Sequence, residues 1–99
     1  MFVGVSRIEI HISGAQSLKD KRKVIKSLAQ RIGSRFNVSV GEIDHHDLWQ
    51  RGTLAVAHVA VNRRDVEKVL QKITSFAEEN AHAEIVRCTY SFFDPDKDL

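Results

Sequence analysis

The sequence predicts an α+β sandwich, in which two helices pack on one face of a four-stranded antiparallel sheet. Three observations predict this fold class. Three segments alternate apolar and polar residues, one further segment is apolar on both faces, and two segments carry apolar residues at helical spacing. The chain has 99 residues, 42% of them hydrophobic, which is enough for one core and a single domain over residues 1–99.

The first strand is predicted over residues 2–13. Ile8, Ile10 and Ile12 fall on one face of the extended chain, and polar residues fall on the other. This period of two, with β-branched residues, is typical of a strand with one buried face. Gly14 ends the segment.

The first helix is predicted over residues 17–33. Ser17 and Asp20 have the spacing of a capping box, in which side chains satisfy the free amides at the start of a helix. Gly33 is a natural end, because glycine tolerates the left-handed conformation that closes many helices. The apolar residues that form one stripe of this helix are Leu18, Ile25, Leu28, Ala29 and Ile32.

Two strands joined by a polar loop are predicted next. Residues 36–43 alternate, residues 44–50 are mostly polar, and residues 53–61 are apolar on both faces except at His58. A strand with two apolar faces belongs in the middle of a sheet. A histidine inside such a strand is typical of a hydrogen-bonded core or interface position.

The second helix is predicted to begin at residues 62–65, with Asn62 or a neighbour as its cap, and to end at residue 80; the last strand is predicted over residues 84–93. One face of that strand carries Val86, Cys88, Tyr90 and Phe92. Residues 94–99 are polar and are expected to be flexible. The order β-α-β-β-α-β predicts a ferredoxin-like sandwich with the first and third strands in the centre.

This topology brings the loops at residues 14–17 and 44–50 to one end, where the first helix begins. That helix carries a basic stripe, and Asp20 is its only carboxylate. The members of the basic stripe are Lys19, Arg22, Lys23 and Lys26. The stripe is either an ordinary solvated face or a surface for an anionic ligand. A formal net charge of +2 limits overall attraction to nucleic acid but allows such a local surface.

Lys21 stands apart, because helical spacing places it among the apolar residues of the inner stripe. An unpaired buried charge is costly, so this lysine should reach past the sheet edge or meet a carboxylate. Asp44 and Asp47 on the adjoining loop are the expected partners in a structural ion pair. A ligand-binding role is the alternative.

The loop residues Asp44, His45, His46 and Asp47 have side chains that suit divalent metal ions. Adjacent residues rarely all converge on one ion, however, and no recognised ligand spacing such as HExxH occurs. We therefore expect no metal and no other cofactor. A metal-dependent enzyme at this loop is the weaker alternative.

Trp49, the only tryptophan, lies beside this loop and close to Arg51. The two side chains either stack on a base or form a contact with a partner, or Trp49 closes the end of the core. Both belong to the end of the molecule where the basic stripe begins.

The sequence contains no recognisable catalytic constellation, since neither a GxSxG motif nor a P-loop occurs. Cys88 is the only cysteine, which excludes an intrachain disulfide, and it is expected in the core. There is no apolar run of about 20 residues and no secretory signal at the start. We therefore expect a non-enzymatic, soluble, cytoplasmic protein that does not bind membranes.

Two stretches carry a family resemblance: Ser17-Leu18-Lys19-Asp20-Lys21-Arg22 and Asp47-Leu48-Trp49-Gln50-Arg51. With their surroundings, over residues 2–92, they closely resemble the YlxP-like family of small bacterial proteins, a domain of unknown function. Asp20 departs from the family pattern, in which glutamate is more usual. The resemblance implies a ferredoxin-like fold without an established activity. Because genes of the family often lie beside genes for translation initiation and small-subunit maturation, it also implies association with RNA or the ribosome.

The expected function is that of an RNA- or ribosome-associated binding module, in small-subunit maturation or translation. The residues expected to contact RNA are Lys19, Lys21, Arg22, Lys23, Lys26, Trp49 and Arg51. The mode should differ from that of RNA-recognition motifs, which display aromatic residues on their central strands, and no sequence reading of DNA is expected. The alternative is a protein-interaction or homo-oligomerisation module that uses the open sheet face, including the Tyr90 and Phe92 side of the last strand.

Overall fold

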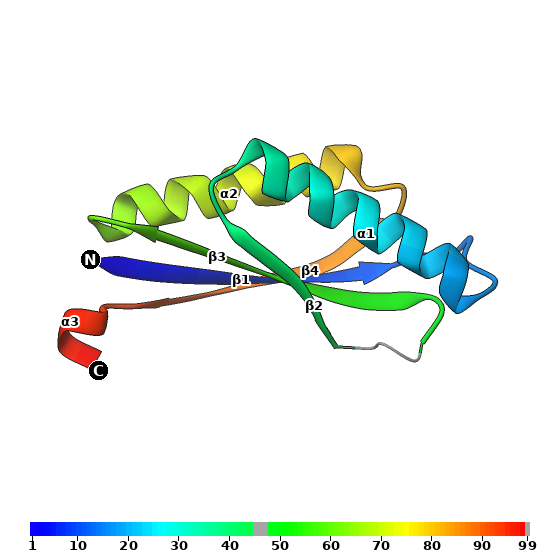
Figure 1. Ribbon diagram of the computed structural model, residues 1–99, viewed down its shortest axis with the longest axis horizontal. Coiled ribbons are helices and arrows are strands. Elements are labelled where there is room, and N and C mark those ends of the chain that lie inside the picture. Colours follow the sequence, from blue (N-terminus) through cyan, green and yellow to red (C-terminus); the bar gives the residue numbers. More distant parts are fainter. Residues whose placement is uncertain (45–47, 99) are drawn as a thin grey trace.

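The computed structural model describes residues 1–44 and 48–98 (Figure 1). The elements are β1 (Phe2–His11), α1 (Leu18–Arg35), β2 (Ser39–Asp44), β3 (Arg51–Ala60), α2 (Arg63–Asn80), β4 (Glu84–Phe93) and α3 (Pro95–Asp98). The strand order is β2-β3-β1-β4, and every neighbouring pair is antiparallel. The ferredoxin-like sandwich is therefore confirmed, with β1 and β3 in the centre as predicted.

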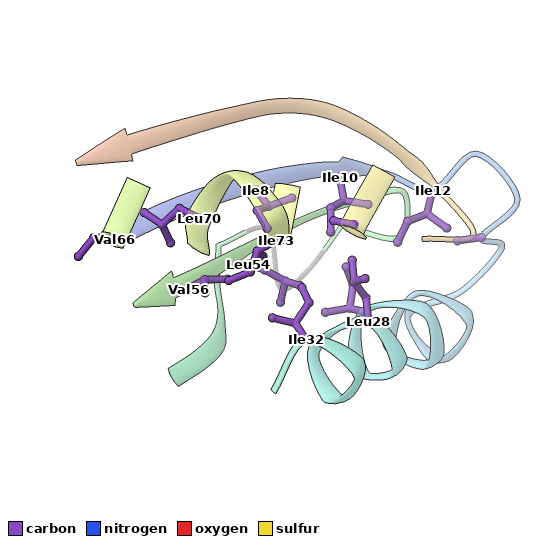
Figure 2. Close-up of a cluster of buried hydrophobic side chains, with 13 residues drawn as sticks. Ile8, Ile10, Ile12, Leu28, Ile32, Leu54, Val56, Val66, Leu70 and Ile73 are labelled. Atoms are coloured by element: carbon purple, nitrogen blue, oxygen red, sulfur yellow. The ribbon is translucent and has the colours of Figure 1, made fainter. Parts of the chain in front are cut away.

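One face of the sheet is covered by α1 and α2, and the opposite face is open (Figure 1). The core lies between the helices and the sheet, and side chains from β1, β3 and both helices meet there (Figure 2). Ile8 and Ile10 of β1, and Ile12 directly after it, point into this core, as their alternation predicts. Each such side chain contributes roughly 1.5–3 kcal/mol by leaving water.

Both helices begin at the predicted caps. The Ser17 hydroxyl accepts a hydrogen bond from the amide of Asp20 at 3.1 Å, and the Asp20 carboxylate accepts one from the amide of Gln16 at 3.1 Å. The Asn62 side chain accepts from the amide of Asp65 at 2.9 Å. These side chains satisfy amides that have no partner within the helix.

The end of α1 differs from the prediction, because the helix continues through Gly33 to Arg35. The cap is Phe36 in an extended conformation, and its amide donates to the Ile32 carbonyl at 2.9 Å. The Phe36 ring then packs edge-on against Phe76 of α2, with 5.8 Å between ring centroids. A contact between helices, rather than a glycine, fixes where the helix stops.

The face of β4 that carries Tyr90 and Phe92 was expected to be open, and this expectation is wrong. Phe92 pairs with Gly4 of β1, and a β-carbon added to Gly4 would collide with Val66 of α2. The Tyr90 hydroxyl lies in hydrogen-bonding contact with the Thr74 hydroxyl of α2. Both aromatic side chains therefore lie on the face of the sheet that α2 covers, with Tyr90 38% exposed, and the opposite face of β4 carries Arg87, Thr89, Ser91 and Phe93.

The C-terminal segment contains the short helix α3, and the flexibility expected for residues 94–99 stays a prediction. The Met1 ammonium group donates a hydrogen bond to Asp96 of this helix at 2.8 Å, which joins the two ends of the chain. None of the described helices is both long enough and apolar enough to span a membrane.

Candidate functional site

The start of α1 and the start of β3 are tied together at one end of the molecule. The Ile12 amide donates to the Gln50 carbonyl at 2.8 Å. The Gln50 side-chain amide donates in turn to the carbonyls of Ala15 at 3.4 Å and Ser13 at 3.5 Å. The prediction that the 14–17 and 44–50 loops lie at the same end is confirmed for the part of the second loop that the structure describes.

The basic stripe of α1 is exposed along its whole length. None of its four side chains forms an ion pair with any residue in the described ranges 1–44 and 48–98. The only carboxylate in the helix, Asp20, is engaged in the N-terminal cap. The positive charge of the stripe is therefore left uncompensated at the surface, which creates a local positive potential.

The basic stripe lies mainly on the outer side of α1, and Lys23 is the member that approaches the end of α2. The guanidinium of Arg31 faces α2, because it donates to the Asn80 carbonyl at 2.9 Å. At 100° per residue, Lys26 lies about 140° around the helix from Arg31, on the opposite side. Lys23 falls between them and lines a small hollow with His82 at the end of α2. The stripe thus extends from the outer face of α1 to the groove between the helices.

Lys21 is buried, with only 1% of its surface exposed. Its ammonium nitrogen lies 3.1 Å from Oε2 of Glu42 on β2, whose side chain is 22% exposed. A carboxylate partner was expected, but Glu42 was not among the candidates. Asp47 lies outside the described residues, as does the side chain of Asp44. The expectation that Lys21 contacts RNA is wrong, because its charged group lies inside the protein.

Glu42 could have been recognised as the partner from its position in the alternation of β2. It continues the series Phe36, Val38 and Val40, so it had to fall on the apolar face of the strand. In the sheet it pairs with Leu54, a fully buried residue of β3. A carboxylate on the buried face of a strand requires a buried cation nearby, and Lys21 is that cation.

Gly52 allows β3 to pass close beneath α1 at this point. A β-carbon added there would lie 2.8 Å from Cδ1 of Ile25 and 3.5 Å from Cε of Lys21. Glycine in a strand often marks such a close approach. The ion pair and Gly52 together fix the first turns of α1 against the sheet, next to the segment that carries Trp49.

Trp49 is not a plug of the core, since 54% of its surface is exposed. Together with Leu48, Gln50 and Arg51 it lines an open hollow of about 520 Å³. Arg51 is exposed as well. An exposed indole beside an exposed guanidinium offers two flat surfaces on which a base can stack.

The metal hypothesis concerns residues that the structure does not describe, namely His45, His46, Asp47 and the side chain of Asp44. Within the described residues, no group of three or more His, Cys, Asp and Glu side chains could hold a metal ion. The hypothesis stays untested.

Cys88 is half-buried in β4. Burial raises the pKa of its thiol above 9.0, a hydrogen bond with Thr74 opposes this effect, and the negative charge of Glu78 adds to it. The thiol is therefore protonated near neutral pH. A protonated, half-buried thiol is a poor nucleophile, which agrees with the expected core role.

The open sheet face has a different character from the helical layer. At the end near the chain termini, Val3 of β1 lies between Val59 and Phe93 on the neighbouring strands. Four large apolar side chains are exposed at this end, and we call them the apolar patch: Met1, Val59, Val61 and Phe93. The two central strands carry no aromatic residue on this face, so it lacks the stacking platform of an RNA-recognition motif.

Comparisons with known proteins agree with this description. The family model "Protein of unknown function (DUF503)" matches residues 3–90. The chain is 40% identical over 74 residues to "Uncharacterized protein YlxP" of Bacillus subtilis (strain 168), covering 75% of this chain and 80% of that protein. A de novo designed protein with a ferredoxin fold, solved by solution NMR, superposes with a TM-score of 0.52 at 12% identity. That match covers 94% of this chain and 83% of the designed one. It shows the fold alone, whereas the two sequence matches show that the chain belongs to the DUF503, or YlxP-like, family of unknown function.

Proposed function

We propose that this protein is a small non-enzymatic module that binds RNA, in the context of the small ribosomal subunit or of translation. The observation that carries the proposal is the exposed basic stripe, which forms no ion pair within the described residues. Lysine and arginine side chains in such an arrangement bind phosphates regardless of sequence. Lys19, Arg22, Lys23 and Lys26 would contact the backbone of the RNA.

Trp49 and Arg51 add a second type of contact at the same end. Phosphate contacts position a strand, and aromatic or guanidinium surfaces stack on its bases. Because Gln50 is bonded to the segment before α1, its neighbours Trp49 and Arg51 lie at the end of the molecule where the basic stripe begins. The combination favours single-stranded RNA, whose bases are free to stack.

The test is co-sedimentation with small ribosomal subunits, and binding to a single-stranded RNA, over a range of salt concentrations. Binding through phosphates should weaken steeply as salt rises. The double variant Lys19→Glu/Lys26→Glu should reduce binding by about tenfold or more, because each substitution replaces attraction with repulsion. Both positions are exposed, so the fold should not change.

The matched control is Arg64→Glu/Lys97→Glu, which changes the net charge equally at exposed positions away from the stripe. It should retain most of the binding. Equal loss in both double variants would mean that overall charge alone governs the interaction. Binding that is absent, or insensitive to salt, would refute the proposal.

A second candidate function is protein interaction or self-association through the open sheet face, which the apolar patch favours. Exposed apolar side chains that lie together often mark a contact surface. The mass in solution of the wild type should then rise with concentration, and Val59→Glu should keep the protein monomeric. Thr89→Glu, an exposed position on the same face outside the patch, is the matched control. A wild type that is monomeric at every concentration would exclude self-association.

A further inference from the structure

A hollow of about 510 Å³ lies between the last turn of α1 and the middle of α2. It sits at the opposite end of α1 from the segment that carries Trp49. Its lining combines three cations, two aromatic rings, two neutral polar side chains and one carboxylate. These residues are Arg35, Phe36, Lys68, Gln71, Lys72, Ser75, Phe76 and Glu79.

Arg35 is held in place by aromatic contacts. Its guanidinium lies over the ring of Phe76, 5.1 Å from the centroid, and Phe36 packs edge-on against the same ring at an interplanar angle of 77°. A guanidinium that rests on an aromatic face loses conformational freedom but keeps its N–H donors. Arg35 is thus prepared to bind a planar or tetrahedral anion with two parallel hydrogen bonds.

Lys68 and Lys72 of α2 face the same hollow, one helical turn apart. Like charges at this spacing destabilise a helix. Elsewhere on the same helix a cation has an ion-pair partner: Nε of Arg63 lies 2.8 Å from Oε1 of Glu67, four residues later. In the described parts of the chain, neither Lys68 nor Lys72 forms an ion pair. The positive charges of Lys68 and Lys72, close together and without an ion-pair partner in the described residues, favour the binding of an anion.

The hollow belongs to a cationic path along the groove between the helices. Lys23 and His82 line a smaller hollow of about 220 Å³ at the other end of this groove. Arg31 bridges the groove between the two hollows through its bond to the Asn80 carbonyl. From Lys19 to Arg35 the helix rises by about 24 Å, which is more than one or two nucleotides can span.

We propose that this hollow binds a phosphate group of the same RNA strand that contacts the basic stripe. Arg35, Lys68 and Lys72 bind the phosphate oxygens, and Ser75 donates a hydrogen bond from the rim. The inference rests on the proposed RNA-binding function and extends it, because it assigns a second contact point and a path for the strand. Along the helix axis alone, at the ~3.4 Å spacing of stacked nucleotides, the separation corresponds to roughly seven nucleotides. Because Lys19 and Arg35 also lie about 160° apart around the helix, the strand must turn from the outer side of α1 towards α2.

The test measures the affinity of the full chain for a single-stranded 12-nucleotide RNA and for a trinucleotide. The variant Lys68→Gln/Lys72→Gln is compared with the wild type and with Arg64→Gln/Lys97→Gln, which removes the same charge elsewhere. We expect the first variant to bind the 12-mer roughly three- to tenfold more weakly. The slope of its salt dependence should be smaller by about 0.7 for each phosphate that the variant no longer binds. The ratio of 12-mer affinity to trinucleotide affinity should also fall, because the strand no longer reaches two contact points.

Arg35→Lys provides a second measurement, because it keeps the charge and removes the planar guanidinium. It should weaken 12-mer binding as well. If the wild type binds the 12-mer, and both the Lys68→Gln/Lys72→Gln variant and Arg35→Lys bind it equally well, the hollow is not a contact point, although the proposed function stands. If the wild type binds neither RNA, the proposed function fails and the hollow proposal fails with it.

Discussion

Charged side chains are arranged differently on the two layers of this sandwich. On the open sheet face, Nε of Arg87 lies 3.8 Å from Oε2 of Glu9, and Nδ1 of His11 lies 3.9 Å from Oε2 of Glu84. On the helical layer, the basic stripe and the cations of the inter-helix hollow form no ion pair within the described residues. Charge pairing therefore differs between the layers: Arg87 is paired with Glu9 on the sheet, whereas the helical layer carries the Arg63–Glu67 pair together with several cations that form no ion pair within the described residues. The electrostatic potential that a binding partner meets therefore differs between the two faces.

Lys21 differs from the other cations of the helical layer, because its paired ammonium group is buried. We expect its pairing with Glu42 to be the most sensitive charge interaction in the molecule. Replacing Glu42 by Gln leaves the ammonium group buried without its carboxylate, which should lower the free energy of unfolding by about 3 kcal/mol. The value lies at the low end of the usual range because Glu42 retains some contact with water. Urea denaturation measures the loss.

The matched control for this pair is the double variant Lys21→Met/Glu42→Leu. Replacing both ions by apolar residues of similar volume is often neutral or stabilising. The double variant should therefore be more stable than Glu42→Gln alone and should keep the basic stripe exposed. If Glu42→Gln changes the midpoint of denaturation by no more than a typical surface substitution, the ion pair does not hold α1 on the sheet.

Trp49 provides a contact by stacking, in addition to the contacts that the charged residues provide. Trp49→Ala should weaken binding to single-stranded RNA by about 1–3 kcal/mol, the usual contribution of a base stacked on an aromatic ring. Because Trp49 is exposed, the stability of the protein should change by less than about 0.5 kcal/mol. Titration with a fluorescently labelled RNA measures the affinity, and the intrinsic fluorescence of this only tryptophan reports contact in the wild type.

Val61→Ala is the matched control, because Val61 is also exposed and apolar but lies at the opposite end of the sheet. It should bind RNA like the wild type. If Trp49→Ala bound RNA as tightly as the wild type but had a much lower free energy of unfolding, Trp49 would act in the core and not in RNA binding.

The sequence was sufficient for the parts of the structure that depend on local patterns. Alternation placed Ile8, Ile10 and Ile12 on the buried face. The capping residues Ser17 and Asn62 marked the starts of the helices. The topology then brought the two loops at the basic end together. Contacts between elements were not accessible in this way. The alternation of β2 indicates that Glu42 faces inward, but its 3.1 Å approach to Lys21 depends on where α1 lies on the sheet. The exposure of Trp49 likewise has no signal in the local pattern.

The hollow between α1 and α2, where we propose a phosphate contact, shows the same limit. Arg35 lies 33 positions before Lys68 in the sequence, and only the antiparallel packing of α1 on α2 brings their side chains to one cavity. The contact between Phe36 and Phe76 that fixes this packing also moves the end of α1 beyond Gly33. A sequence pattern within one helix cannot reveal a site that two helices share.

The smallest expected effect concerns the matched charges at the chain termini. The hydrogen bond to Asp96 is the main reason that the pKa of the Met1 ammonium group is raised above 8.0. Since the folded state holds this proton more tightly than the unfolded state, the contribution to stability is complete below pH 8.0 and disappears as the pH rises through the folded-state pKa. Asp96→Asn should therefore lower the urea midpoint slightly at about pH 7, and the difference from the wild type should vanish once the pH has risen through the folded-state pKa. A difference that persists unchanged at the higher pH would mean that Asp96 stabilises α3 by some other contact. The ion pair between the Met1 ammonium group and Asp96 would then not contribute to stability.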